Sequence, residues 1–171
     1  AFSTLGDGIP DWWRREFFGD VYAPAPETTA AVTPPANLHD WQRADVAVVL
    51  SVDPRVEAVA TTFYTLDNGP ATQAEQVDVR QEGIHNVTYW SVFQVGAGTY
   101  TEPAKTLTVR LDKTPPAISV ASRLPSANPA GWNNGPVTVQ YAVEDALSGV
   151  DATLGGYEPD VVATEGEEQQ E

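Results

Sequence analysis

The amino-acid sequence predicts an all-β protein in which tandem β-sandwiches follow one short N-terminal helix. From Asp45 onward, apolar residues alternate with other residues at period two, as in strands with one buried face. Helical periodicity of useful length is confined to the first 20 residues. A repeat with a spacing of 91 residues indicates two copies of a small domain: Ala36, Asn37, Trp41, Val46, Val48 and Val52 recur as Ala127, Asn128, Trp132, Val137, Val139 and Val143.

The strands of each copy are predicted from β-branched and aromatic runs that turn residues separate. In the first copy these runs cover residues 46–52, 61–66, 76–80, 84–93 and 106–111. In the second copy they cover residues 117–120, 137–143 and 160–164.

The N-terminal segment predicts a short helix. Pro10 suits a first helical turn, and Asp11 follows where an acidic side chain complements the helix dipole. Ile9, Trp13 and Phe17 are spaced four apart and so share one face. Because so short a helix is not stable alone, we expect it to dock on another surface.

The chain divides into five predicted segments. A stretch rich in Pro, Ala and Thr reads as an extended linker, and a Lys-Thr-Pro-Pro run marks a second linker. The segments are the helix at 1–20, a linker at 21–39, a sandwich at 40–112, a linker at 113–116 and an incomplete second sandwich at 117–171. The second copy lacks a counterpart of residues 84–111. We expect either that the protein continues beyond this sequence or that a second polypeptide supplies the strands.

The composition restricts the partners. The chain has 24 acidic and 9 basic residues and a formal net charge of −15, which disfavours nucleic acid and anionic membrane surfaces and permits cations, calcium in particular. It has no cysteine, so no disulfide framework forms. No apolar run reaches the roughly 18 residues of a membrane-spanning helix, so we expect no membrane insertion.

Several motifs resemble a family of bacterial immunoglobulin-like repeats. They are Thr-Leu-Asp-Asn-Gly at 65–69, Glu-Gly-Ile-His-Asn-Val-Thr-Tyr at 82–89, Thr-Val-Arg-Leu-Asp-Lys-Thr-Pro-Pro at 108–116, Gly-Trp-Asn-Asn at 131–134 and Asp-Ala-Leu-Ser-Gly-Val at 145–150. The resemblance covers residues 33–171 and implies tandem immunoglobulin-like sandwiches. Such repeats occur on secreted, cell-wall and surface-layer proteins and beside carbohydrate-active enzymes, and they are not known for catalysis. The resemblance therefore implies an extracellular or cell-surface location.

The N-terminal Gly6-Asp7-Gly8-Ile9-Pro10-Asp11 run is similar to a dockerin-like or thrombospondin-type calcium loop. Calcium takes six to eight oxygen ligands, closed by a bidentate glutamate. With Asp7 and Asp11 in their loop positions, Ser3, Leu5 and Arg14 occupy positions that should hold further ligands. We therefore prefer the interpretation that Asp7 and Asp11 shape the helix start.

A second calcium hypothesis concerns the junction between the sandwiches. Asp112 ends the first copy, while Glu144, Asp145 and Asp151 lie near turns of the second. Tandem sandwiches can stiffen a junction by sharing calcium among such acids. The alternative is a solvated acidic rim.

Catalytic and zinc chemistry find little support. Two histidines and no cysteine make a zinc site improbable. Glu57, Glu102, Glu144 and Asp145 could supply carboxylates for glycoside hydrolysis, but we interpret them as solvated turn residues.

Aromatic residues could instead form a binding surface. Trp41 and Trp132 occupy equivalent repeat positions and are interpreted as packing anchors. Five others lie outside the repeat pairing and would mark a binding site if exposed together: Trp12, Trp13, Trp90, Phe93 and Tyr100.

Two functional hypotheses follow. The chain is either a non-catalytic structural or adhesive surface protein, assembling with copies of itself or with a chain that completes the second domain, or an accessory module of a secreted carbohydrate-active enzyme that contacts polysaccharide. We favour the first because the sequence combines tandem repeats, Pro-rich linkers and no catalytic constellation.

Overall fold

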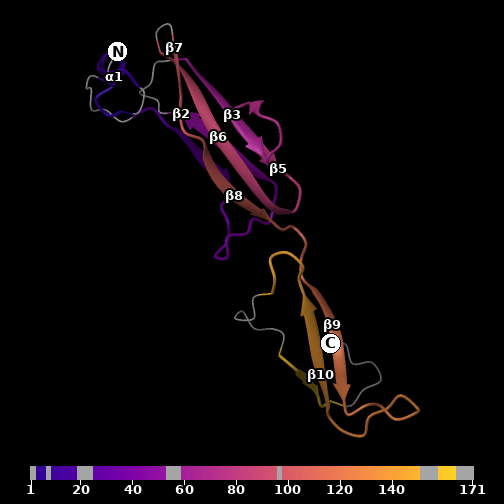
Figure 1. The fold of residues 1–171 in the computed structure, drawn as a ribbon. Helices are drawn as coiled ribbons and strands as arrows, with labels where there is room; N and C mark the ends of the chain where they lie inside the picture. The colour runs from indigo at the N-terminus through magenta and orange to yellow at the C-terminus, as the bar shows by residue number, and fades with distance from the viewer. Residues whose placement is uncertain are drawn as a thin grey trace. The chain divides into compact units, whose positions relative to one another are not determined.

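The computed structural model describes residues 3–6, 9–18, 25–52, 59–95, 98–150 and 158–164 (Figure 1). The chain forms two compact units, unit 1 at Ala1–Lys113 and unit 2 at Thr114–Glu171. The described elements are strands apart from one short helix, so the all-β fold class predicted from the sequence is confirmed.

Unit 1 is a two-sheet sandwich of antiparallel strands. One sheet has the order β1-β2-β5, and the other has the order β4-β3-β6-β7, with β8 also paired to β6. The elements of this unit are α1 (Asp11–Phe18), β1 (Thr28–Thr33), β2 (Val46–Val52), β3 (Ala60–Leu66), β4 (Thr72–Gln73), β5 (Gln76–Val79), β6 (Gly83–Val95), β7 (Gly98–Thr101) and β8 (Lys105–Leu111).

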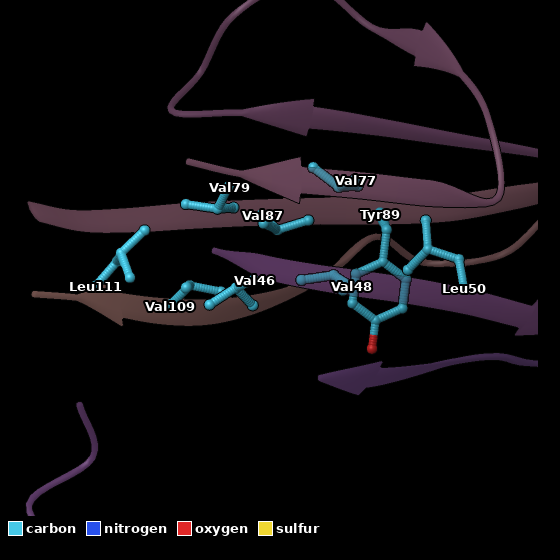
Figure 2. Close-up of a cluster of buried hydrophobic side chains, with 9 residues drawn as sticks. All are labelled: Val46, Val48, Leu50, Val77, Val79, Val87, Tyr89, Val109 and Leu111. Atoms are coloured by element: carbon cyan, nitrogen blue, oxygen red, sulfur yellow. The ribbon is translucent and has the colours of Figure 1, made fainter. Parts of the chain in front are cut away.

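The core of unit 1 lies between the two sheets (Figure 2). It consists of nine buried side chains, mostly valine: Val46, Val48, Leu50, Val77, Val79, Val87, Tyr89, Val109 and Leu111. Because successive strand residues point to opposite faces, alternate positions of β2, β5, β6 and β8 converge on this layer. The period-two pattern of the sequence thus corresponds to the observed core.

Residues 28–33 differ from the expected linker, because they form β1. This strand pairs with β2 along its length, from Thr28 opposite Val52 to Thr33 opposite Ala47. The Pro, Ala and Thr content predicts an extended conformation, which is correct. It does not reveal that the free edge of β2 is available to pair with the extended segment.

The helix α1 docks within unit 1. Ile9 and Trp13 are fully buried and pack with Phe93 of β6, and Tyr100 and Val52 pack against the edge of this cluster. The prediction that Ile9 and Trp13 share a docking face is therefore confirmed, while the side chain of Phe17 lies outside the described residues. The helix therefore packs against its own domain.

Unit 2 contains one described sheet, with strand order β11-β10-β9. Its strands are β9 (Ala117–Leu124), β10 (Val137–Glu144) and β11 (Asp160–Val162), and both pairings are antiparallel. The pair Leu124 and Thr138 lies 91 positions after the pair Thr33 and Ala47. The sheet of unit 2 is therefore the counterpart of the β1-β2-β5 sheet of unit 1.

The turn before β2 and β10 is also repeated atom for atom. The Asn37 side-chain oxygen accepts the Trp41 amide at 3.0 Å, and that of Asn128 accepts the Trp132 amide at 3.0 Å. The residue before each tryptophan has a positive φ, 63° at Asp40 and 88° at Gly131. Asn is favoured at such turns because its side chain bonds its own backbone.

Candidate functional site

The principal candidate site is one face of the unit 2 sheet, here called the open face. In unit 1, the inward side chains of β2 are covered by the second sheet, so Val46 and Val48 are at most 1% exposed. The open face carries the corresponding β10 residues together with side chains of β9 and β11 at the same register. Its members are Ile118, Val120, Arg123, Val137, Val139, Tyr141, Val143, Asp160 and Val162.

Much of the open face is accessible. Ile118 is 59% exposed and Val120 is 43% exposed, while Val139 at the centre is buried. Part of the face is hollowed into a pocket of about 690 Å³, which includes Tyr141 and Pro159 in its lining. No described residue of unit 2 forms a second sheet over this face. An accessible apolar sheet surface of this kind is typical of an interaction site.

Two opposite charges flank the centre of the open face. Val139 is paired with Arg123 on β9 and with Asp160 on β11. The corresponding residue Val48 of unit 1 is flanked by Val32 and Val77. The second copy therefore has a cation and an anion where the first copy has two valines. The repeat spacing aligns Arg123 with Val32, but Asp160 does not lie at that spacing from Val77, so its place opposite Val139 could not be predicted from the sequence.

The twin tryptophans differ between the units. Trp41 is partly buried and Trp132 is 56% exposed, so Trp132 is not the packing anchor predicted for it. In unit 1 the residue after Trp41 bonds β8: the Gln42 amide donates to the Arg110 carbonyl and the Gln42 carbonyl accepts the Asp112 amide. No described strand of unit 2 occupies the place of β8.

A buried polar cluster lies at the β1 end of unit 1. The Glu102 carboxylate, 2% exposed, accepts the amides of Thr28 at 2.9 Å and Ser91 at 2.7 Å, and also the Thr28 hydroxyl. The Thr28 hydroxyl gives its one proton to Glu102, so it must accept a hydrogen bond from the Ser91 hydroxyl, at 2.6 Å. The Ser91 hydroxyl in turn accepts from the Thr62 hydroxyl, at 2.9 Å. Glu102 is thus not the solvated turn carboxylate predicted from the sequence; it ties β1 to β6.

Lys105 supplies positive charge at this cluster. Its Nζ donates to Glu27 Oε2 and to the Thr28 carbonyl, each at 2.9 Å, and lies 3.7 Å from Glu102 Oε2. Burial lowers the pKa of Lys105, but the hydrogen bond to Glu27 and the two carboxylates raise it by more, so the net shift is upward. The cluster is a structural ion pair network.

A second polar link joins Asp67 to His85. The Asp67 carboxylate lies 2.7 Å from His85 Nδ1 and accepts the Asn86 amide at 2.8 Å. His85 Nε2 lies 2.8 Å from the Gln81 carbonyl. The hydrogen bonds from His85 and Asn86 hold the pKa of Asp67 below its ordinary value. His85 therefore links the start of β6 to Asp67 and Gln81.

The five aromatic residues proposed as a binding surface do not gather on one. Trp13 and Phe93 are fully buried, which contradicts their place in an exposed patch, and Tyr100 stacks on Phe93 at 6.1 Å. Trp12 is 45% exposed on α1. Trp90 lies on the outer face of β6, where it stacks on Phe63 of β3 with ring centroids 5.9 Å apart.

The outer face around Trp90 is rich in threonine. Thr88 and Thr106 share a hydrogen bond of 2.9 Å across β6 and β8, and Thr108 donates to the Asn86 side chain at 3.0 Å. An aromatic pair beside hydroxyl groups is a surface on which a sugar chain can lie. This face is the second candidate site.

The calcium hypotheses stay predictions. Asp7 and Asp151 lie outside the described residues. Asp11 accepts the Thr4 amide at 2.7 Å and the Thr4 hydroxyl at 2.5 Å, and these bonds lower the pKa of Asp11, so its carboxylate shapes the helix start as preferred above. Among the described residues, no group of three or more His, Cys, Asp or Glu side chains could hold a metal ion.

The acids of the junction hypothesis have separate surroundings. Asp112 is buried in unit 1. In unit 2, Glu144 ends β10 on its outer face, and the Asp145 carboxylate accepts the amides of Leu147 at 3.1 Å and Gly149 at 3.0 Å. Asp145 is thus a turn residue. Glu57, the remaining acid considered for glycoside hydrolysis, lies outside the described residues.

Comparison of the chain with protein-family models, with curated proteins and with solved structures gives no match. In the part of the chain that the structure describes, no helix has the length and apolarity to span a membrane.

Proposed function

We propose that this chain is a non-catalytic structural or adhesive module of an extracellular or cell-surface protein, built from immunoglobulin-like repeats. The observation that carries the proposal is the repetition of one antiparallel strand pairing and one hydrogen-bonded turn in both units. Repetition of a whole structural unit extends a chain or multiplies contacts. It adds nothing to a single reactive centre.

The use of the charged side chains supports this proposal. The buried carboxylate of Glu102 accepts hydrogen bonds from Thr28 and Ser91, and the carboxylate of Asp67 is bonded to His85. Both carboxylates therefore hold strands together. An acid with a catalytic task is instead directed toward a cleft that admits substrate.

The proposal is tested by imaging and fractionation. We expect negative-stain electron microscopy of the purified chain to show ordered assemblies, and an antiserum against it to label intact cells of the source organism. A chain that stays dispersed and is found only inside cells would contradict the proposal. Calcium is tested separately, because a melting temperature that does not rise at millimolar calcium excludes a structural calcium site.

The alternative is a polysaccharide-binding accessory module, which the Phe63 and Trp90 stack favours. Retention on insoluble polysaccharide is expected to depend on Trp90 if the outer face binds sugar chains. The control is Trp132→Ala, which removes an exposed tryptophan of unit 2. Equal retention of the Trp90→Ala variant and the unchanged chain would dismiss the alternative.

A further inference from the structure

We infer that Asn134 of unit 2 is a site of self-catalysed chemical modification, at which the side-chain amide is lost as ammonia through a cyclic imide. The inference goes beyond the proposed function and does not depend on it. Asn-Gly pairs are suited to this reaction, because glycine has no Cβ to hinder its amide nitrogen in an attack on the preceding side chain. The chain has two such pairs, at 68–69 and 134–135, and proline follows both of them.

The reaction needs only water beyond the chain itself. The Gly135 amide nitrogen gives its proton to hydroxide in the solvent and attacks Cγ of Asn134, so that an N–Cγ bond forms. The Cγ–Nδ2 bond then breaks, and Nδ2 takes a proton from water and leaves as ammonia. Water opens the resulting five-membered imide at either carbonyl, which gives aspartate or isoaspartate. The net change converts one amide and one water into one carboxylic acid and one ammonia.

The first pair, Asn68-Gly69, is held in a geometry that opposes the attack. The Gly69 amide donates to the Leu66 carbonyl at 2.9 Å, so the nitrogen required for the attack is held by an acceptor. The φ angles are 51° at Asp67 and 61° at Asn68, which is typical of a type I′ turn. The Asp67 carboxylate ties this turn to β6 by accepting the Asn86 amide at 2.8 Å. The reaction therefore requires that the turn open first.

The second pair lacks these restraints. Asn134 and Gly135 are both exposed and lie between the Asn128 turn and β10. Within the part of the chain that the structure describes, the Gly135 amide donates to no acceptor. Asn134 is outside the left-handed region, and a Cβ added at Gly135 would meet nothing within 4 Å. The Gly135 nitrogen can therefore reach the side chain of Asn134 without the loss of a hydrogen bond.

The modification distinguishes the two copies of the repeat. At the spacing of 91 residues, Asn134 and Gly135 correspond to Arg43 and Ala44, which cannot undergo this reaction. The product adds one negative charge to a chain whose formal net charge is −15. Isoaspartate also lengthens the backbone by one carbon shortly before β10 begins at Val137. The segment that leads into β10 thus changes with the age of the protein, while its counterpart in unit 1 does not.

The test is peptide mapping by mass spectrometry of the full chain, kept folded in a mildly alkaline buffer and sampled over time. Trypsin cleaves after Lys and Arg and so places the two pairs in separate peptides, 56–80 and 124–171. Asn134 is expected to show the mass change from amide to acid, and a protein isoaspartyl methyltransferase is expected to label the isoaspartate form. Asn68 is expected to react at least about tenfold more slowly, since its turn must open first.

Unfolding is the matched control for the local sequence. In urea both Asn-Gly-Pro segments lose their structure, so Asn68 and Asn134 are expected to react at similar rates. The matched variant is Gly135→Ala, which places a methyl group on the attacking residue. It is expected to suppress the reaction at Asn134 and to leave the melting temperature unchanged, because the space around Gly135 is open.

Three outcomes would overturn the inference. Equal rates at Asn68 and Asn134 in the folded chain would show that the hydrogen-bonded turn does not decide the site. An Asn134 that stays intact in the folded chain, while it is converted in urea, would show that the folded segment excludes the reaction. A Gly135→Ala variant that reacts as fast as the unchanged chain would exclude the Gly135 nitrogen as the attacking group. None of these outcomes bears on assembly or on cell-surface labelling, so the proposed function is tested separately.

Discussion

Replacing Glu102 with alanine is expected to destabilise unit 1 more than any other single removal of an acidic side chain. The carboxylate is the common acceptor of Thr28, at the first residue of β1, and of Ser91 in the middle of β6. It also faces Lys105 at 3.7 Å. Its removal leaves two backbone amides and one hydroxyl without their acceptor in a buried site.

The magnitude follows from those donors. A buried donor left unsatisfied costs about 1–3 kcal/mol, so the two amides together give a loss of about 3–5 kcal/mol in the free energy of unfolding. Domains of this size have a total of about 5–15 kcal/mol, so Glu102→Ala is expected to be stable only marginally. Glu102→Gln keeps one acceptor oxygen and most of the shape, and it is expected to cost about 1.5–3 kcal/mol.

The assay is urea unfolding of the full chain, with amide hydrogen exchange at Thr28 and Ser91 as the local measurement. Both amides are expected to exchange faster in Glu102→Gln, which still folds. The control is Glu75→Ala, an exposed acid whose loss is expected to cost no more than about 0.5 kcal/mol. If Glu102→Ala were as stable as Glu75→Ala, the structural assignment of the cluster would be refuted.

Three further predictions concern unit 1. The hydrogen bonds from His85 and Asn86 lower the pKa of Asp67 in the folded state. The stability that the Asp67 carboxylate contributes is therefore present above the unfolded pKa of about 3.9 and is lost as pH falls through the folded pKa. Asp67→Asn is therefore expected to flatten the acid limb of a stability-against-pH curve; an unchanged limb counts against the Asp67 and His85 pair. Trp13→Ala is expected to cost about 3–5 kcal/mol in urea unfolding, and Trp12→Ala, on the exposed side, under about 0.5 kcal/mol; equal losses would mean that α1 does not dock as described. Gly83 has a φ of 133°, so Gly83→Ala is expected to cost about 1–3 kcal/mol by the same measurement, whereas no loss would show that β6 can begin differently.

The sequence predicts the parts of the fold that are encoded locally. Alternation along 46–52 and 76–80 places Val46, Val48 and Val77 on one face, and the structure buries all three. The repeat identifies β10 as the counterpart of β2 in the second copy. These features could be predicted because, in each strand, apolar residues at alternate positions mark the face that is buried.

Features that depend on distant pairing could not be predicted in this way. Thr28 and Glu102 are 74 positions apart, and nothing near either residue signals that the two meet. β1 likewise forms where the composition indicates a linker, because the edge of β2 supplies hydrogen bonds that an extended segment can use. The docking surface of α1 depends on Phe93, which belongs to β6.

The candidate site of unit 2 combines features that are encoded locally with one that depends on distant segments. Its Asn128 turn and the β9–β10 pairs from Leu124 opposite Thr138 to Ser122 opposite Gln140 reproduce those of unit 1, although no described strand covers the open face. The first sheet of the repeat therefore takes its geometry from its own residues, and the covering layer contributes burial. The exposed Ile118 and the charges at Arg123 and Asp160 are consequences of that separation. The residues of the face can therefore differ between the two copies while the sheet that carries them stays the same.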